Sequence, residues 1–172
     1  MKKNIILIGM PGVGKSTVGV VLAKVLGYRF LDSDLLIQEQ EGRLLHDIID
    51  EEGIDSFIQI ENRVNASIQA ERSVIATGGS VVYGREAMEH LKQIGIVIYL
   101  QLPYLALTTR LGNLHNRGVV LRDRQTLSDL YEERTPLYEQ YADITICEED
   151  MSVENTLSAI LHCLEEYGEG HC

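Results

Sequence analysis

The segment from Gly9 to Thr17 constrains the fold of this chain more than any other, because it matches the pattern G-x-x-x-x-G-K-[ST] at every required position. Its flanks agree with the structural context that this motif needs. The apolar run at residues 4–8 predicts a buried strand, and Lys15–Leu26 has the periodicity of a helix. The sequence therefore predicts a strand, a glycine-rich turn and a helix N-terminus, which together form an anion-binding site.

The residue types of this motif suit the phosphates of a nucleotide. Glycine tolerates positive φ and has no Cβ, so the backbone can come close to a phosphate group. Lys15 can supply a cation for the β- and γ-phosphates, and the Ser16 hydroxyl can hold Mg²⁺. A chance glycine turn before a helix is the alternative, and it does not account for the agreement of pattern, flanks and register. The expected nucleotide-binding residues are Gly12, Val13, Gly14, Lys15, Ser16 and Thr17.

Composition narrows the partners of the chain. The 172 residues suit one domain, and a hydrophobic content of 45% is that of a globular protein. The formal net charge of -11 disfavours nucleic acid and anionic membranes, and no apolar run approaches the length of a membrane span. Three cysteines without paired spacing, and too short a stretch for a signal peptide before the first strand, favour the cytoplasm. We expect a single domain over residues 1–172 that is a monomer.

Strand and helix patterns alternate along the rest of the chain. Further strands are expected at residues 28–31, 73–77, 96–100 and 143–147. Further helices are expected at residues 83–93, from Pro103 to about Leu111, and at 126–141 and 153–167. Residues 35–72 are mostly helical in pattern and form an insertion that could bind a phosphoryl acceptor, although plain helical packing also explains their apolar stripe. This order predicts an α/β fold with a parallel sheet and helices on both faces.

Two acidic residues, Asp32 and Asp34, follow the second expected strand. Ligands of doubly wound α/β folds meet the sheet at the carboxyl ends of its strands. One carboxylate there can lie near Mg²⁺, and the other can accept a proton from an attacking hydroxyl. Alternatively, one of them is only the N-cap of the helix that begins near Leu35. One residue can be the cap while the other takes part in the chemistry.

Two further stretches are candidates for the site. Gly78-Gly79-Ser80 follows the third expected strand, where glycine would allow close approach to a ligand or simply form a tight turn. Residues 112–124 are polar and rich in arginine, as a lid over a phosphate needs to be. Within this stretch Arg122 stands beside Asp123, and an ordinary surface ion pair is the alternative interpretation for it.

Together these motifs resemble the shikimate kinase family, within the nucleoside-monophosphate-kinase-like P-loop fold. The similarity covers nearly the whole chain, and it rests on five stretches. They are Gly9–Gly19, Phe30-Leu31-Asp32-Ser33-Asp34, Thr77-Gly78-Gly79, Arg117-Gly118-Val119-Val120 in place of the lid motif R-P-L-L, and Arg134-Thr135-Pro136-Leu137-Tyr138, which fits R-x-P-L-Y. The resemblance implies three layers around a five-stranded parallel sheet of order 2-3-1-4-5, a lid over about residues 112–124, and use of ATP with Mg²⁺.

The resemblance also implies roles for single residues. On the nucleotide side, Lys15 contacts the phosphates, Ser16 and Asp32 serve the Mg²⁺, and Arg110 stacks on the adenine. Arg117 closes over the transferring phosphate. On the acceptor side, helical residues 33–72 form the binding segment. The residues implied there are Asp34, which orients or deprotonates the acceptor hydroxyl, Gly78, Gly79 and Ser80, which line the pocket, and Arg134, which binds a carboxylate.

Three positions depart from the family pattern. Ile58 stands where the family usually has an arginine that shares the carboxylate with the equivalent of Arg134. Ser80 replaces the third glycine of a G-G-G motif, and Gly118 replaces the lid proline. Loss of a charged donor weakens carboxylate binding, so shikimate is expected to be a poor acceptor unless Arg43 or Arg63 compensates.

The sequence leaves three functions to compare. A kinase that moves the γ-phosphate of ATP to a hydroxyl of a small polar metabolite agrees with the retention of Lys15, Asp34 and Arg117. A nucleotide-binding regulatory module without turnover is the alternative. A nucleoside monophosphate kinase would need several arginines in residues 35–72, which offer only Arg43, Arg63 and Arg72.

Overall fold

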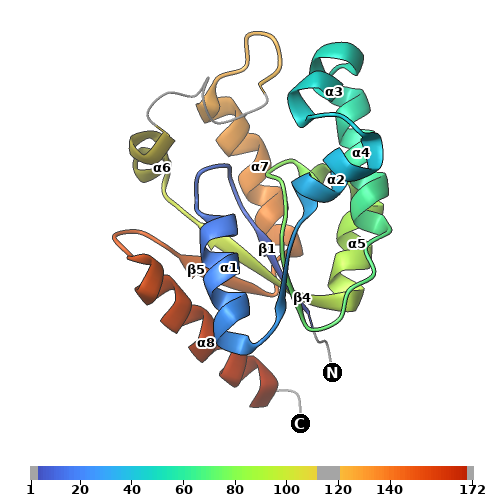
Figure 1. Ribbon diagram of the computed structural model, residues 1–172. Helices are drawn as coiled ribbons and strands as arrows, with labels where there is room; N and C mark the ends of the chain where they lie inside the picture. The colour runs from blue at the N-terminus through green and yellow to red at the C-terminus, as the bar shows by residue number, and fades with distance from the viewer. Residues whose placement is uncertain (1–3, 112–120, 170–172) are drawn as a thin grey trace.

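A five-stranded parallel sheet forms the centre of the computed structural model, which describes residues 4–111 and 121–169. The strand order is β2-β3-β1-β4-β5, as expected from the family resemblance (Figure 1). The strands are β1 (Asn4–Ile8), β2 (Arg29–Asp32), β3 (Ser73–Ala76), β4 (Gly95–Gln101) and β5 (Ile144–Cys147). All residues of β1 and β3 are buried, because helices cover both faces of a parallel sheet.

Helices form the two outer layers. In chain order they are α1 (Lys15–Leu26), α2 (Ser33–Glu41), α3 (Leu45–Glu52), α4 (Ile54–Ala66), α5 (Arg85–Ile94), α6 (Tyr104–Leu111), α7 (Leu127–Tyr141) and α8 (Val153–Glu169), with a 3₁₀ turn at Val81–Tyr83. Helices α1 and α8 pack together on one face, whereas α5 and α7 pack on the other (Figure 1). None of these helices is long and apolar enough to cross a membrane, within the residues described.

The expected elements are present, with small shifts at their ends. The helix expected at 83–93 begins at Arg85, because Val81–Tyr83 forms a 3₁₀ turn first. Thr126 is the N-cap of α7 and not its first residue, since its side chain and that of Asp129 form a reciprocal capping box.

The apolar interior is divided into two parts. The larger cluster fills both sides of the sheet, around residues such as Ile6, Leu22 and Ile98. A smaller cluster joins α2, α3 and α4 to one another. Its buried members are Ile37, Ile48, Phe57 and Val64. The inserted helical segment therefore has an apolar core of its own.

Asn4 anchors the central strand at the end of the sheet away from the phosphate loop. Its side chain is buried, and its Nδ2 donates hydrogen bonds to the carbonyl oxygens of Ala70 (2.7 Å) and Ile94 (3.0 Å). Its Oδ1 accepts from the N–H of Ser73 at 3.0 Å. One amide group thus ties β1 to the segments that precede β3 and β4.

We expect Asn4→Ala to lower the free energy of unfolding by about 2–4 kcal/mol, because the truncation leaves two carbonyl groups and one N–H without these partners. Urea unfolding followed by circular dichroism should show a lower midpoint with an unchanged slope. Asn155→Ala, at an exposed position of α8, is the control and should unfold like the natural protein. Equal midpoints for the two variants would contradict this account.

Candidate active site

The loop between β1 and α1 presents a helix N-terminus that carries no side-chain cap. Gly14 is the N-cap of α1 and has a left-handed conformation with φ 93°, and Gly12 has φ 88°. No acidic residue lies in the first turn of α1. The N–H groups at this end are therefore free to bind an anion, as the motif predicts.

Lys15 carries a buried positive charge in this loop. Its Nζ donates hydrogen bonds to the carbonyl oxygens of Gly9 (2.7 Å) and Met10 (2.9 Å). Burial lowers its pKa to about 8, although Asp34 and other carboxylates nearby oppose the shift. The ammonium is thus mostly charged at pH 7, and Lys15 lines the cavity at the phosphate loop.

Ser16 and Asp32 lie together beside this loop. The Ser16 hydroxyl donates to Asp32 Oδ2 at 3.2 Å, and Asp32 Oδ1 accepts the N–H of Asp34 at 2.9 Å. Asp32 is therefore the N-cap of α2, and Asp34 is left for another role. Hydroxyl and carboxylate oxygens fit Mg²⁺, which binds through one or two protein ligands plus phosphate oxygens. No group of three or more His, Cys, Asp or Glu side chains in the described part of the chain could hold a metal by itself.

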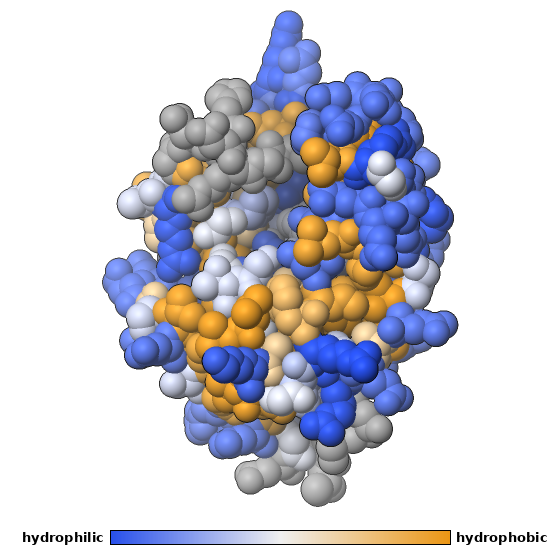
Figure 2. Space-filling model, in the orientation of Figure 1, coloured by the Kyte–Doolittle hydropathy of each residue, from blue (hydrophilic) through white to orange (hydrophobic). Residues whose placement is uncertain are grey.

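Two adjoining cavities open at the carboxyl ends of the strands. The smaller, of about 340 Å³, is lined by the phosphate loop, and the larger, of about 430 Å³, lies between α2–α4 and α7. The surface is hollowed at this place (Figure 2). The two cavities share four of their lining residues, which are Pro11, Asp34, Gly78 and Gly79. A group bound in one cavity can therefore meet a group bound in the other.

Asp34 is the acidic residue at this shared wall. Burial and the neighbouring Asp32 raise its pKa to about 6, and Lys15 partly opposes the shift. A carboxylate with this pKa is mostly ionised at pH 7 and is a better proton acceptor than an ordinary aspartate.

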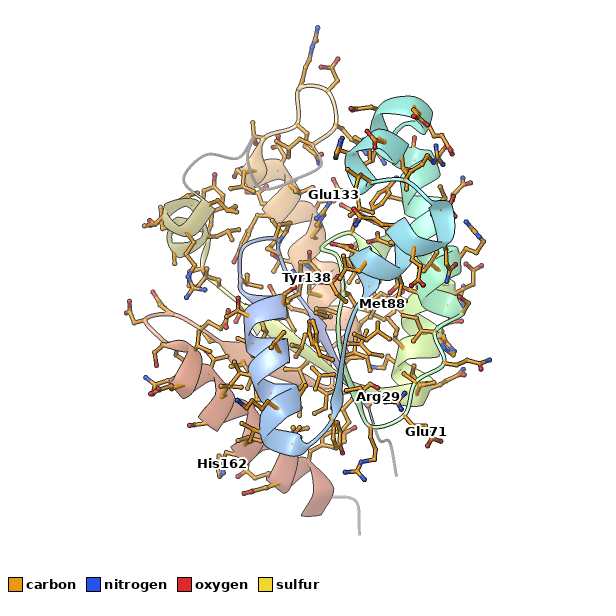
Figure 3. The ribbon with its side chains drawn as sticks, in the orientation of Figure 1. Arg29, Glu71, Met88, Glu133, Tyr138 and His162 are labelled. Atoms are coloured by element: carbon orange, nitrogen blue, oxygen red, sulfur yellow. The ribbon has the colours of Figure 1, made fainter. Side chains whose placement is uncertain are left out.

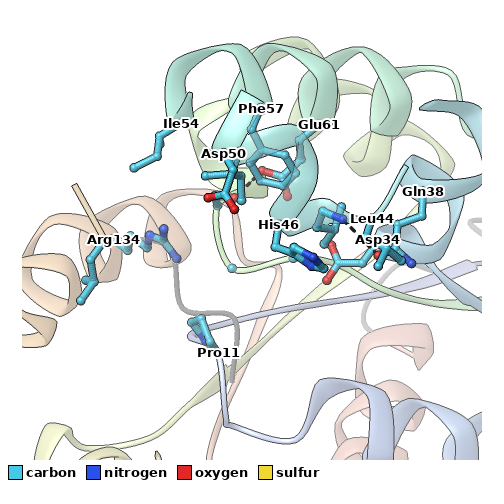
Figure 4. Close-up of a pocket in the computed structure, with 16 residues that line it drawn as sticks. Pro11, Asp34, Gln38, Leu44, His46, Asp50, Ile54, Phe57, Glu61 and Arg134 are labelled. Carbon is cyan, nitrogen blue, oxygen red and sulfur yellow. Dashed lines mark hydrogen bonds between the residues drawn. The ribbon is translucent and has the colours of Figure 1, made fainter. Parts of the chain in front are cut away.

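Arg134 enters the larger cavity from α7, on the side opposite Asp34 (Figure 4). The residue is 4% exposed, its guanidinium lies 5.4 Å from the centre of the Tyr83 ring, and its Nε donates to Tyr83 Oη at 3.3 Å. Among the described residues, no carboxylate lies within salt-bridge distance of it. Its charge is thus available to an anionic ligand.

The motif R-x-P-L-Y has a structural explanation in α7. Arg134 and Tyr138 are one turn apart, so both face the loop after β3. A methyl group on Gly79 would lie 2.8 Å from Arg134 Nη1, and the Tyr138 hydroxyl donates to the Gly79 carbonyl at 2.6 Å. Tyr138 lies near the centre of the molecule, stacked on Tyr99 (Figure 3). Glycine is needed at position 79 because α7 approaches the backbone closely.

The arginines considered as substitutes for the one missing at Ile58 are bound elsewhere. Arg43 pairs with Glu51 (2.6 Å) and Glu52 (2.5 Å), and Arg63 pairs with Glu41. Neither lines the larger cavity. Ile58 itself lines a small hollow beside this cavity, together with Ser80 and Arg134.

Arg122 forms an ion pair at the surface, as the alternative interpretation expected, but Asp123 was the wrong partner. Arg122 Nη2 binds Asp55 Oδ1 at 2.6 Å and joins the segment before α7 to α4. Arg117 and the rest of residues 112–120 lie outside the described residues, so the expected lid is described only from Leu121 onward. Arg110 lies by the phosphate loop, where its Nη1 donates to the Val13 carbonyl at 3.3 Å.

Several residues of the larger cavity were not identified from the sequence. Gln38, His46, Asp50 and Glu61 line it from α2, α3 and α4. Glu61 had a visible signal, since it stands four residues after Phe57 on the apolar stripe of α4, where a charged residue is unusual. The other three lie on helices whose polar faces carry no motif.

Comparison with known proteins agrees with this geometry. The family model described as shikimate kinase matches residues 11–165. Shikimate kinase of Vibrio cholerae is 37% identical over 169 residues, which cover 96% of this chain and 97% of the relative. Shikimate kinase 1 of Citrobacter koseri is 39% identical over 168 residues, covering 95% and 97%.

Solved structures give the same result. The shikimate kinase of Acinetobacter baumannii in complex with shikimate superimposes with a TM-score of 0.85 at 35% identity, and the match covers 96% of this chain and 94% of that one. The enzyme of Aquifex aeolicus has a TM-score of 0.78 at 29% identity, with 97% and 99% covered. The chain therefore belongs to the shikimate kinase family, whose members are ATP-dependent kinases that phosphorylate a hydroxyl group.

Proposed function

We propose that this chain transfers the γ-phosphate of ATP to a hydroxyl of a small polar metabolite bound between Asp34 and Arg134. The observation that carries the proposal is the pair of adjoining cavities with Asp34 in their shared wall. One cavity has the chemistry of a phosphate site and the other that of an organic acceptor with an anionic group. We assign the helical residues 33–72 to the acceptor and residues 112–124 to a lid.

On the nucleotide side, the residues assigned to binding are Gly12, Val13, Gly14, Lys15, Ser16, Thr17 and, at the adenine, Arg110. The free N–H groups of the loop and the Lys15 ammonium bind phosphate oxygens, which takes over the hydrogen bonds that Lys15 makes to Gly9 and Met10. Ser16 and Asp32 are assigned to Mg²⁺, which when bound neutralises charge on the phosphate oxygens. Arg117 is assigned to the transferring phosphate from the family resemblance.

On the acceptor side, Asp34 accepts the proton of the attacking hydroxyl. Its pKa of about 6 keeps it ionised at neutral pH, and it lines both cavities. Gly78 and Gly79 form the wall at which the two reactants meet, and Ser80 extends this wall. Arg134 binds an anionic group of the acceptor.

We further propose that shikimate is a poor acceptor for this chain. Arg134 is the only lysine or arginine that lines the larger cavity among the described residues. A carboxylate that enters the cavity loses its water and regains charged hydrogen bonds from one guanidinium only. Ile58 is apolar and donates no hydrogen bond to replace the lost water, whereas an arginine at this position would.

We expect MgADP at a hundredfold excess over Kd to raise the apparent stability by about 2.7 kcal/mol, because it binds the folded state alone. Lys15→Met should abolish kinase turnover, since it removes the cation from the phosphate loop. The control is Lys24→Met, at an exposed position of the same helix. Thermal unfolding and a coupled kinase assay measure the two effects. An unchanged melting temperature at millimolar MgADP would contradict the nucleotide site.

Asp34→Asn should lower kcat by about 10²–10⁴-fold, because the amide cannot accept the proton. In the natural protein kcat/KM should fall as the pH decreases through about 6, since protonated Asp34 is inactive as a base. If Asp34 had the pKa of an ordinary aspartate, kcat/KM would not change with pH above about pH 5. Asp150→Asn, at an exposed site, is the control. If Asp34→Asn keeps full rate while Asp32→Asn is inactive, the two roles are interchanged.

Ile58→Arg should raise kcat/KM for shikimate at least tenfold, because it returns a second guanidinium to the carboxylate. Gln59→Arg adds the same charge one residue along, at an exposed position, and should change nothing. Steady-state kinetics of the three proteins measure the effect. If the natural protein already phosphorylates shikimate as fast as an ordinary member of the family, the proposal on shikimate fails.

A further inference from the structure

Glu61 is a buried carboxyl group with one oxygen unused. The residue is 1% exposed, and it projects from α4 into the larger cavity (Figure 4). Its Oε1 accepts a hydrogen bond from the Ser80 hydroxyl at 2.5 Å, whereas its Oε2 is buried and has no hydrogen-bond partner in the described structure. A buried polar atom without a partner is costly, so a missing donor is to be expected.

The free oxygen lies beside Gly78, a residue that lines both cavities. A methyl group built on Gly78 would lie 2.6 Å from Glu61 Oε2 and 2.9 Å from Asp34 Oδ1. The two carboxyl groups thus flank the bare backbone of one glycine. A ligand that presents a hydroxyl to Asp34 brings its neighbouring atoms within reach of Glu61.

No side chain of the described residues provides the missing donor. Ile58, on the adjacent turn of α4, is apolar, and Glu61 forms no salt bridge with any residue outside the undescribed stretch 112–120 and the chain ends. Ser80, which stands where a family glycine is expected, supplies the only hydrogen bond that the Glu61 carboxyl group receives from the described residues. Ser80 therefore gives a neutral donor to one oxygen of the Glu61 carboxyl group, and the apolar Ile58 offers no donor to the other.

We infer that Glu61 is a specificity-determining residue whose Oε2 accepts a hydrogen bond from a hydroxyl or ammonium group of the phosphoryl acceptor. Ser80 holds the carboxyl group in position through the other oxygen. The inference rests on the proposed kinase function and names the acceptor class more closely. That class is a hydroxylated molecule with a donor group next to the reacting hydroxyl and at most one carboxylate.

The charges of the cavity favour an ammonium over a hydroxyl. Three carboxyl groups line it, from Asp34, Asp50 and Glu61, against the single guanidinium of Arg134. Burial and Asp34 raise the pKa of Glu61 to about 7, while Ser80, Arg134 and Lys15 oppose the shift. A cationic group at Oε2 would stabilise the ionised form and offset the desolvation of the carboxylate.

The test measures binding of three probes in the presence of MgADP by calorimetry: shikimate, inositol and a monoamino-inositol. We expect the amino compound to bind the natural protein at least tenfold more tightly than inositol, and Glu61→Gln to remove that difference. Equal binding of the two inositols, with a tenfold loss for both in Glu61→Gln, supports the hydroxyl form of the proposal. Affinities that Glu61→Gln leaves within twofold for all three probes, or no binding of any probe, overturn it.

Controls separate recognition from folding and from catalysis. Glu71→Gln changes an exposed glutamate far from the cavity and should leave every affinity unchanged (Figure 3). MgADP should bind Glu61→Gln as it binds the natural protein. Ser80→Gly should weaken binding of the amino probe less than Glu61→Gln does, since it removes only the hydrogen bond that holds the Glu61 carboxyl group in position. Probe binding that depends on Glu61 but leads to no phosphate transfer would refute the proposed function and leave this inference standing. Phosphate transfer to a probe whose affinity Glu61→Gln leaves unchanged would overturn this inference and leave the proposed function standing.

Discussion

The buried ammonium of Lys15 is the charge around which both halves of the site are arranged. It is 8% exposed, and burial would drive it towards the neutral form if Asp34, Glu148 and Asp32 did not oppose the shift. Without ligand, these carboxyl groups balance the cation together with two backbone carbonyls. In the proposed function, a polyphosphate bound in the loop balances Lys15 instead. The same proposal then leaves Asp32 available to a metal ion and Asp34 to the hydroxyl of the acceptor.

The parts of the fold that could be predicted have local signals. The apolar run at residues 4–8 and the glycine-rich turn after it required no knowledge of distant contacts. The strand order came from the family resemblance, and the structure confirms it. Asp32 and Asp34 could not be distinguished from the sequence, because both follow a strand. The bond from the Asp34 N–H to Asp32 decides which one is the cap.

The parts that could not be predicted depend on contacts between distant segments. Arg122 binds Asp55, 67 residues away, and its neighbour Asp123 was a misleading local partner. Arg43 and Arg63 looked available in the sequence, but glutamates of α2 and α3 occupy them in the fold. Glu61 was overlooked because the stripe of α4 was interpreted by its apolar members alone.

The separate apolar cluster of α2, α3 and α4 has a consequence for how such a protein can change over generations. Ile37, Ile48, Phe57 and Val64 pack mainly with one another, whereas the phosphate loop is supported by the core of the sheet. A substitution within the small cluster therefore alters the stability of that cluster and leaves the core under the phosphate loop intact. If α2–α4 bind the acceptor as proposed, changes in acceptor choice are decoupled from phosphoryl-transfer chemistry, and duplicated copies of such a gene can diverge in substrate while they remain kinases.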